Sequence, residues 1–308
     1  MIAKDHPGQG STAMSNDSGP VLVIGATGQQ GRATATALLE QGGRVRAFVR
    51  DPESAGARAL RSEGAELVVG DLDDPGSVKA ALDGSASVFL MLTMMEGVHI
   101  TAAGIAAEQR RGELVIDLAR DSGIEHLVYS SLRGAGQNSG VEYYAAKEHL
   151  ESYLAVQGVP ATILRPVFFM DNFASFNRPV LDDTGTLTVN LAVRSEIPLS
   201  LISVRDIGAF AALALTHRDE FLGRTLSIAG DRLTPPQIAQ VFGAAAGLPA
   251  RNVVVPNEAV RAFDEQVAKM FAFFNEAPDE GVDVSALRAL HPGLQDLPTW
   301  LRATGWRP

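Results

Sequence analysis

The feature that most constrains the fold of this chain is a short apolar segment followed at once by three evenly spaced glycines. Residues 21–24 read Val-Leu-Val-Ile, Gly25, Gly28 and Gly31 follow at intervals of three, and a helical pattern of Ala and Leu begins behind them. In a strand–turn–helix that holds a dinucleotide, one glycine permits the tight turn, one lets backbone N–H groups approach a pyrophosphate, and one lets the helix pack closely on the strand. Because strand and helix both flank the glycines, the segment favours nucleotide binding over a purely structural turn. The predicted nucleotide contacts in this turn are Gly25, Thr27, Gly28, Gln29, Gln30 and Gly31.

Short apolar runs alternate with helical segments beyond this turn. The alternation is typical of an α/β fold with a doubly wound parallel Rossmann sheet, here of about seven strands, covered by helices on both faces. The predicted strands are Val21–Ile24, Val45–Val49, Glu66–Val69, Ser87–Leu92, His126–Ser130, Ala161–Leu164 and Thr225–Ala229. The predicted helices lie near residues 30–42, 53–63, 75–82, 101–122 and 140–157.

The regular alternation ends after Arg165-Pro166, and this change suggests a second unit. We expect residues 21–165, together with the last strand at 225–229, to form the nucleotide-binding domain. Residues 166–224 and 233–308 are expected to form a smaller C-terminal substrate-binding lobe over the carboxyl ends of the strands, where open α/β sheets bind ligands. Residues 1–20 are polar and rich in Gly, Ser and Asp, and we expect a disordered tail there.

Charge and composition disfavour several classes of function. A net charge of −10 argues against nucleic acid as a partner, and the absence of cysteine excludes thiolate metal sites and disulfides. No two histidines have metal-ligand spacing, so no metal site is expected. No apolar run reaches the about 18 residues of a membrane span, and the first residues lack the apolar centre of a secretion signal. The sequence therefore favours a cytoplasmic monomer or homodimer that acts on a small molecule, without a membrane partner.

The end of the second strand bears on which dinucleotide binds. Arg50 occupies the strand tip, nineteen residues after Gly31, and a guanidinium there suits a ribose 2′-phosphate, with Arg32 as a second contact. Asp51 would serve a 2′-hydroxyl if the strand ended one residue later, although its place before Pro52 also suits a helix cap. We favour NADP(H) over NAD(H) on this pattern.

Polar residues at the ends of the next two strands are further candidates for cofactor contacts. Asp71 follows the third strand and is placed to accept a hydrogen bond from the adenine amino group, with Leu72 against the ring, although a turn role for Asp71 is nearly as well supported. Thr93 ends the fourth strand, where the nicotinamide half would lie. Met94 beside it is read as pocket wall.

Ser130, Tyr143 and Lys147 form the predicted catalytic set. Ser139 and Glu142 match a capping box, which predicts a helix start at Gly140 and places Tyr143 and Lys147 on one helical face. A lysine four residues from a tyrosine stabilises the phenolate and lowers its pKa, so that the tyrosine can give a proton to a carbonyl oxygen held by Ser130. Ribose hydroxyls of a bound nucleotide would be natural partners of the lysine. A rotated helix would instead turn Tyr144 toward the ligand.

At this point the chain resembles the NmrA-like branch of the atypical short-chain dehydrogenase/reductase superfamily. The resemblance covers about residues 20–230 and rests on motifs taken together: Gly25-Ala-Thr-Gly28-Gln-Gln-Gly31, the strand end before Arg50-Asp-Pro, Gly70-Asp71-Leu72, Lys147-Glu-His-Leu, Arg165-Pro166 with Phe169-Met170-Asp-Asn172, and Ser203-Val-Arg-Asp206-Ile-Gly208. It implies an NADP-type Rossmann domain, with Pro166 and Phe168 beside the cofactor. It also implies a substrate pocket walled by Phe169, Asn172 and Phe173, next to Met94.

Members of this branch include reductases of quinones, dyes and phenolic compounds, and also regulators that bind the dinucleotide without turnover. We therefore expect an NAD(P)H-dependent reductase of a small, largely apolar carbonyl, quinone-like or unsaturated substrate. The alternatives are a redox-sensing regulator, and a non-redox biosynthetic enzyme on the same fold.

Overall fold

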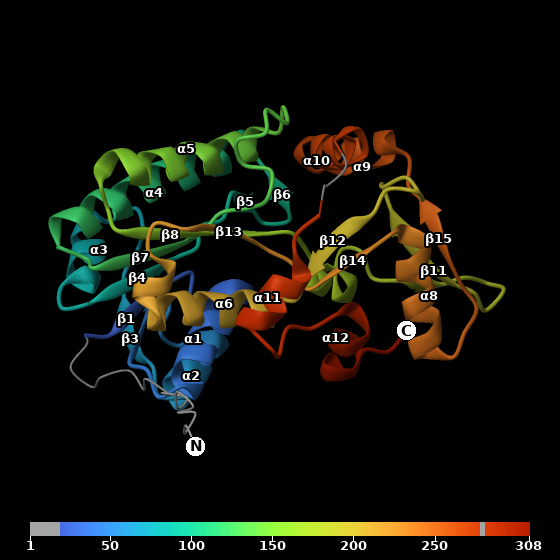
Figure 1. Ribbon diagram of the computed structural model, residues 1–308. Helices are drawn as coiled ribbons and strands as arrows, with labels where there is room; N and C mark the ends of the chain where they lie inside the picture. The colour runs from blue at the N-terminus through green and yellow to red at the C-terminus, as the bar shows by residue number, and fades with distance from the viewer. Residues whose placement is uncertain (1–18, 278–280) are drawn as a thin grey trace, which may run out of the picture.

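The computed structural model of the protein describes residues 19–277 and 281–308, so the predicted tail lies outside the described residues except for Gly19 and Pro20. Its largest element is a seven-stranded sheet in the order β3-β2-β1-β4-β7-β8-β13, in which every neighbouring pair is parallel (Figure 1). This order and the flanking helices confirm the predicted doubly wound Rossmann sheet. The strands are β1 (Val21–Ile24), β2 (Val45–Val49), β3 (Glu66–Val69), β4 (Ser87–Leu90), β7 (His126–Ser130), β8 (Ala161–Pro166) and β13 (Thr225–Ile228).

Helices cover both faces of this sheet, and the edge strand β3 keeps exposed residues at both of its ends. On one face lie α1 (Gln29–Glu40), α2 (Ala55–Ser62) and α6 (Val204–Thr216), which is followed by the short α7 (Arg218–Phe221). On the other lie α3 (Pro75–Leu82), α4 (Ala102–Asp121) and α5 (Glu142–Gln157) (Figure 1). Since both faces are covered, the central strands β1 and β7 are buried along their whole length.

The start of α5 differs from the sequence prediction. The helix begins at Glu142, its N-cap is Val141, and no side chain caps it. Ser139 Oγ accepts a hydrogen bond from Val141 N instead, and the Glu142 carboxylate lies 2.9 Å from Lys269 Nζ. The expected capping box is therefore wrong. Gly140 has a φ of +71°, so the chain turns through the left-handed region directly before the helix and Ser139 cannot reach the first turn.

The smaller lobe contains two three-stranded sheets. One joins β10 (Val180–Leu181), β11 (Leu187–Leu191) and β15 (Ala250–Val254), and the other joins β14 (Asp231–Leu233), β12 (Leu199–Ile202) and β9 (Phe168–Phe169). Around them lie the 3-10 helix η1 (Met170–Ala174), α8 (Pro235–Ala246), α9 (Asn257–Phe263), α10 (Glu265–Glu276), α11 (Val284–Leu290) and α12 (Leu297–Thr304). A separate apolar core that includes Phe173, Phe242 and Trp300 holds this lobe together.

The boundaries predicted for the lobe, 166–224 and 233–308, need correction at three places. Helix α6 lies within the first range, yet Ile207 and Phe210 on it belong to the core of the large sheet. Leu287 of α11 joins the same core. Strand β14 begins at Asp231, before the second range starts. Periodicity along the chain predicts a helix but not the surface against which it packs, so the predicted boundaries differ from the packing seen in the structure.

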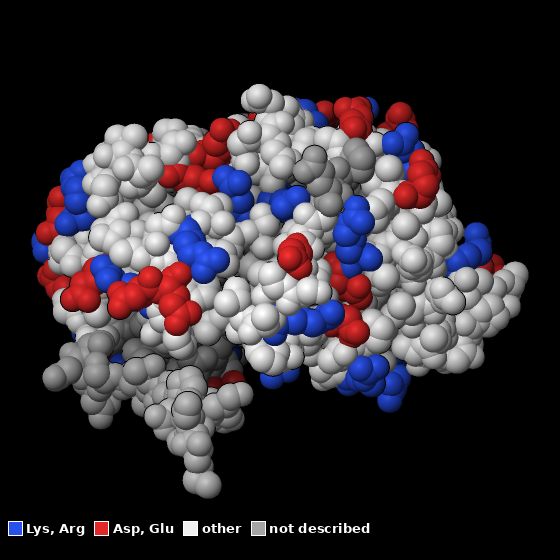
Figure 2. Space-filling view, viewed as in Figure 1, with Lys and Arg blue, Asp and Glu red and all other residues white. Residues whose placement is uncertain are grey.

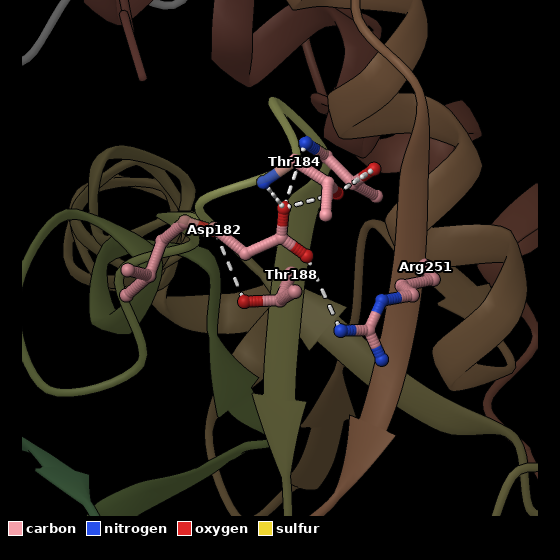
Figure 3. Close-up of polar contacts among 6 residues, drawn as sticks. Asp182, Thr184, Thr188 and Arg251 are labelled. Atoms are coloured by element: carbon pink, nitrogen blue, oxygen red, sulfur yellow. Dashed lines mark hydrogen bonds and ion pairs between the residues drawn. The ribbon is translucent and has the colours of Figure 1, made fainter.

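Asp182 ties together the three strands of one lobe sheet (Figure 3). Its Oδ1 accepts hydrogen bonds from Thr184 Oγ1 at 2.6 Å, from Thr184 N at 3.0 Å and from Thr186 N at 3.0 Å, which close the turn between β10 and β11. Its Oδ2 lies 3.2 Å from Arg251 Nη2 on β15. The hydrogen bonds from Thr184 and Thr186 and the contact with Arg251 lower the pKa of Asp182 to about 2. The turn thus fixes the strand β11, which lines the cavity described below.

The described residues 19–277 and 281–308 contain no helix that is both long and apolar enough to cross a membrane. On the face shown in Figure 2, acidic and basic side chains are intermixed rather than gathered into one basic surface.

Close packing of α6 on α1 gives a test of the fold. A Cβ on Gly208 would lie 2.4 Å from the backbone carbon of Ala33, so Gly208→Ala must push the two helices apart. We expect a loss of about 2 kcal/mol or more in the free energy of unfolding, measured by urea denaturation. The control is Gly76→Ala in α3, where a Cβ meets only the Asp74 carboxylate at 3.3 Å, and where the change should stay within about 1 kcal/mol. Equal effects of the two variants would contradict this account of the packing.

Candidate active site

The glycine turn after β1 has the backbone geometry that the spacing predicts. Gly25 has a φ of +77°, and its carbonyl accepts a hydrogen bond from Gly28 N at 2.9 Å. A Cβ on Gly31 would lie 2.1 Å from that same carbonyl oxygen, so no side chain fits there. Helix α1 begins directly behind the turn without a side-chain cap. Its first N–H groups therefore face the carboxyl edge of the sheet, where an anion can accept hydrogen bonds from them.

Arg50, at the tip of β2, lies beside this turn because β2 pairs with β1 in parallel. Its side chain is exposed and makes no hydrogen bond or ion pair with any residue within 19–277 and 281–308. Arg32, the predicted second contact, is instead paired with Glu63. Asp51 accepts a hydrogen bond from Glu53 N at 2.9 Å, and Ser54 rather than Asp51 caps α2. Arg50 is therefore the guanidinium available for a ligand at this strand tip.

Asp71 and Leu72 have largely structural environments. Asp71 Oδ1 accepts a hydrogen bond from Asp73 N at 2.9 Å, and its backbone N–H donates to Ser77 Oγ at 3.0 Å, as in a turn. Leu72 is half-buried against the core under α3 and α4. Neither residue lines the cavity, although both lie at the carboxyl edge of the sheet.

A cavity of about 1140 Å³ separates this edge from the lobe. The large domain contributes the start of α1 and the segments that follow β4, β7 and β8, while the lobe contributes η1, β11, β12, α9 and α10. Ten of the predicted site residues line it: Gln29, Gln30, Thr93, Met94, Tyr143, Lys147, Pro166, Phe168, Phe169 and Asn172. Most of the other lining residues are apolar, and Lys147 and Arg133 are the charged ones among those described.

Two helices of the lobe, α9 and α10, close the cavity against the large domain. Asp264 Oδ2, at the junction of the two helices, accepts a hydrogen bond from Ile100 N at 2.8 Å, and Gln266 Oε1 accepts one from Glu142 N at 3.1 Å. Figure 1 shows both helices beside the start of α5 and the hairpin of β5 (Met95–Glu96) and β6 (His99–Ile100). Phe273 and Phe274, on α10, face the cavity from this side.

Ser130 does not face the cavity as predicted. Its hydroxyl donates a hydrogen bond to Gln30 Oε1 at 2.6 Å, on the side of the sheet that α1 covers. Ser131, the next residue, lines the cavity, and its hydroxyl donates to Glu151 Oε1 on α5 at 2.5 Å. Neighbouring side chains of an extended segment point to opposite faces, so the strand direction decides which serine meets a ligand.

Phe173 is also misplaced by the sequence analysis. It is fully buried in the lobe core, with its ring 5.2 Å from that of Phe242, and it is not among the cavity residues. Asn177 and Asn190, which the sequence analysis does not single out, line the cavity near Asn172.

Tyr143 and Tyr144 both line the cavity. The orientation of α5 therefore does not turn one tyrosine toward a ligand and the other away from it. Their rings meet edge to face with centroids 4.8 Å apart, and their hydroxyls are hydrogen-bonded to each other. Burial and this contact raise the pKa of Tyr143 well above that of a free phenol, and burial raises the pKa of Tyr144 as well. The expected lowering of the Tyr143 pKa by Lys147 is therefore wrong, and both tyrosines are neutral donors at neutral pH.

The partner of Lys147 explains this outcome. Lys147 Nζ lies 2.5 Å from Glu108 Oε1, and the two side chains are 6% and 0% exposed. The ammonium therefore faces a carboxylate rather than a phenolate. Glu108 lies on the buried face of α4 with Gly104 and Gly112, at intervals of four. The spacing of four can be read from the sequence. The sequence does not show that Glu108 on α4 pairs with Lys147 on α5.

Comparison with known proteins places the chain in a family. A model of the NmrA-like family matches residues 17–300. The NAD(P)H azoreductase of Xenophilus azovorans is 30% identical over 240 residues, which are 77% of this chain and 78% of that protein. The (4-alkanoyl-5-oxo-2,5-dihydrofuran-3-yl)methyl phosphate reductase of Streptomyces griseus is 29% identical over 288 residues, 90% of this chain and 92% of that one.

Among solved structures, the fold is similar to that of NmrA, a negative transcriptional regulator in complex with NADP. The TM-score is 0.78 at 21% identity, over 93% of this chain and 95% of that one. Since the family model spans both the Rossmann domain and the lobe, the chain belongs to the NmrA-like family.

Proposed function

We propose that this protein is an NADPH-dependent reductase of a largely apolar carbonyl, quinone-like or unsaturated compound. The observation that carries the proposal is the cavity itself, which joins the uncapped start of α1 to Tyr143 and Lys147 and to an apolar lobe wall. Two relatives named as reductases support the same class of reaction.

The residues present fit a dinucleotide. A Cβ on Gly25 would meet Met91 O at 2.9 Å and a Cβ on Gly31 would meet Gly25 O at 2.1 Å, so only glycine lets the turn pack this closely against α1. This close packing suits a turn whose backbone N–H groups approach a pyrophosphate. Arg50 would hold the 2′-phosphate of NADP(H), and Lys147 would donate to ribose hydroxyls. Thr93, Pro166 and Phe168 would flank the nicotinamide. When bound, the reduced nicotinamide supplies the hydride.

Tyr143 is the proposed proton donor. As a neutral phenol it donates a hydrogen bond, and then a proton, to the substrate atom that becomes negatively charged as hydride arrives. Ser131 replaces Ser130 as the serine facing that atom. The apolar walls exclude water from the reacting atoms, while Asn172, Asn177 and Asn190 offer hydrogen bonds to neutral polar groups of a substrate.

A regulator that only senses the nucleotide is the second candidate, supported by the fold likeness to NmrA. The cavity has apolar space opposite Lys147, which a substrate would fill. A regulator that binds only NADP(H) does not need this space, so the space favours the enzyme. NADPH oxidation with a panel of carbonyl, quinone and azo compounds separates the two. Turnover of any of them supports the reductase, and nucleotide binding without turnover supports the regulator.

The assignment of Arg50 predicts a change in nucleotide preference. Arg50→Ala should weaken NADPH binding at least about tenfold, because charge-assisted hydrogen bonds to the 2′-phosphate are lost, and should leave NADH binding nearly unchanged. Calorimetric titration with both nucleotides measures this. The control is Arg61→Ala, which removes another exposed arginine, at the far end of α2. A preference for NADPH that survives Arg50→Ala would refute the assignment.

The role of Tyr143 predicts an effect on turnover but not on nucleotide binding. Tyr143→Phe should lower kcat for a responsive carbonyl substrate by roughly 100-fold, with the affinity for NADPH retained. Tyr153→Phe on the same helix is the control, since Tyr153 hydrogen-bonds to Asp117 away from the cavity. If Tyr144→Phe causes the loss and Tyr143→Phe does not, the two tyrosines exchange roles. Full activity of both variants removes the phenols from the mechanism.

A further inference from the structure

Helices α4 and α5 pack side by side and are joined by polar contacts that differ sharply in burial. Lys147 Nζ meets Glu108 Oε1 at 2.5 Å with both side chains almost fully buried. His149, two residues after Lys147 on α5, meets Glu113, five residues after Glu108 on α4; His149 Nε2 lies 2.6 Å from Glu113 Oε1, with side chains that are 43% and 33% exposed. The first contact is at the cavity and the second faces solvent. The same pair of helices thus offers a buried contact and a natural control for it.

Glu108 depends on Lys147 for its counter-charge. Neither oxygen of its carboxylate accepts a hydrogen bond from the part of the chain that the structure describes. Lys147 Nζ also donates to Leu92 O at 3.4 Å and lies 5.5 Å from the centre of the Tyr129 ring. The ammonium is therefore the one cation set against this buried carboxylate within residues 19–277 and 281–308.

The other titratable groups around the pair are accounted for. Tyr129, on β7, presents a hydroxyl that has no hydrogen-bond partner among residues 19–277 and 281–308, and burial together with the charges of Glu108 and Glu151 raises its pKa. The Tyr143 hydroxyl is bonded to Tyr144. Glu151, on α5, is bound by Arg165 and Ser131. None of these groups replaces Glu108 as the partner of Lys147.

We propose that Glu108 is a positioning residue of the site: it keeps Lys147 protonated and holds its ammonium at the cavity wall. An unpaired amine in an apolar wall loses its proton readily, because burial disfavours the charged form. A carboxylate at 2.5 Å opposes that effect. The inference rests on the proposed function, since a protonated Lys147 is what donates to the ribose hydroxyls.

Packing alone gives no reason for a carboxylate here. An apolar side chain of similar size would fill the same space without the cost of removing two charges from water. Glu108 instead sits between Gly104 and Gly112, whose lack of side chains lets α4 approach its neighbours. A Cβ on Gly112 would lie 2.6 Å from Leu150 Cδ1 on α5. The small residues thus bring α4 close enough for Glu108 to reach Lys147.

The direct test follows the protonation of Lys147 in the protein without nucleotide. The chain has four lysines, so lysine-selective isotope labelling gives few NMR signals, and Lys147→Met identifies the signal of Lys147. In Glu108→Gln we expect that signal to titrate at least about one pH unit lower than in the wild type. Glu113→Gln, the same change on the same helix, should leave it unchanged. Equal titration of Lys147 in wild type and Glu108→Gln overturns the proposal, as does an equal shift in both variants.

If Glu108→Gln does not fold, Glu108→Asp takes its place. The shorter side chain withdraws the carboxylate by about one bond length, so a smaller shift in the same direction is expected, and no shift counts against the proposal.

A second measurement connects the pair to the proposed function. Calorimetry with NADPH between pH 7 and 9.5 should give a nearly constant affinity for the wild type, and for Glu108→Gln an affinity that falls about tenfold as pH rises and Lys147 becomes neutral. Lys147→Met should bind weakly without this slope. A constant affinity in Glu108→Gln overturns the role in binding. If the wild type binds no nucleotide, the proposed function fails, while the NMR titration still tests Glu108.

Discussion

The close approach of α1 to the turn after β1 is the contact on which the rest of the site depends. Gly31 lies so near the Gly25 carbonyl that even a methyl group would not fit, and this brings the start of α1 to the carboxyl edge of the sheet. Because β4, β7 and β8 run parallel to β1, their ends reach the same edge. Thr93, Ser131 and Pro166, at the ends of these strands, therefore line one wall of the cavity. The glycine turn lies at the same edge of the sheet.

The lobe contributes a largely apolar wall to the cavity. Most of the residues that line the cavity are apolar, and the described charged ones are Lys147 and Arg133. In such surroundings a phenol stays neutral and an ammonium needs a partner, and both effects follow from the cost of burying charge. Tyr143 finds its partner in Tyr144 and Lys147 finds its partner in Glu108. The cavity wall therefore carries two phenols and one paired cation, each of which has an N–H or O–H group that can donate a hydrogen bond.

Much of the fold could be read from local patterns. The sequence predicts all seven strands of the large sheet, because most of them are short apolar runs bounded by turn residues. Tyr143 and Lys147 were placed on one helical face because a spacing of four leaves no alternative once a helix forms. The sequence analysis selects Ser130, whereas in the structure Ser130 bonds Gln30 and Ser131 lines the cavity. The order of residues along a strand does not say which face α1 covers. Phe173 looked like pocket wall because its neighbours Phe169 and Asn172 are, yet it packs into the lobe core.

The Rossmann topology, the glycine turn and the placement of Tyr143 and Lys147 on one helical face follow from local patterns, since each depends on residues close together in the chain. Two contacts depend instead on how distant elements pack together: Lys147 meets Glu108, 39 positions earlier, and α6 packs on the large sheet rather than in the lobe. This packing also decides that Asn177 and Asn190 reach the cavity. The physical reason is that periodicity specifies which side of an element is buried, whereas the partner of that side is set by how whole elements pack in three dimensions.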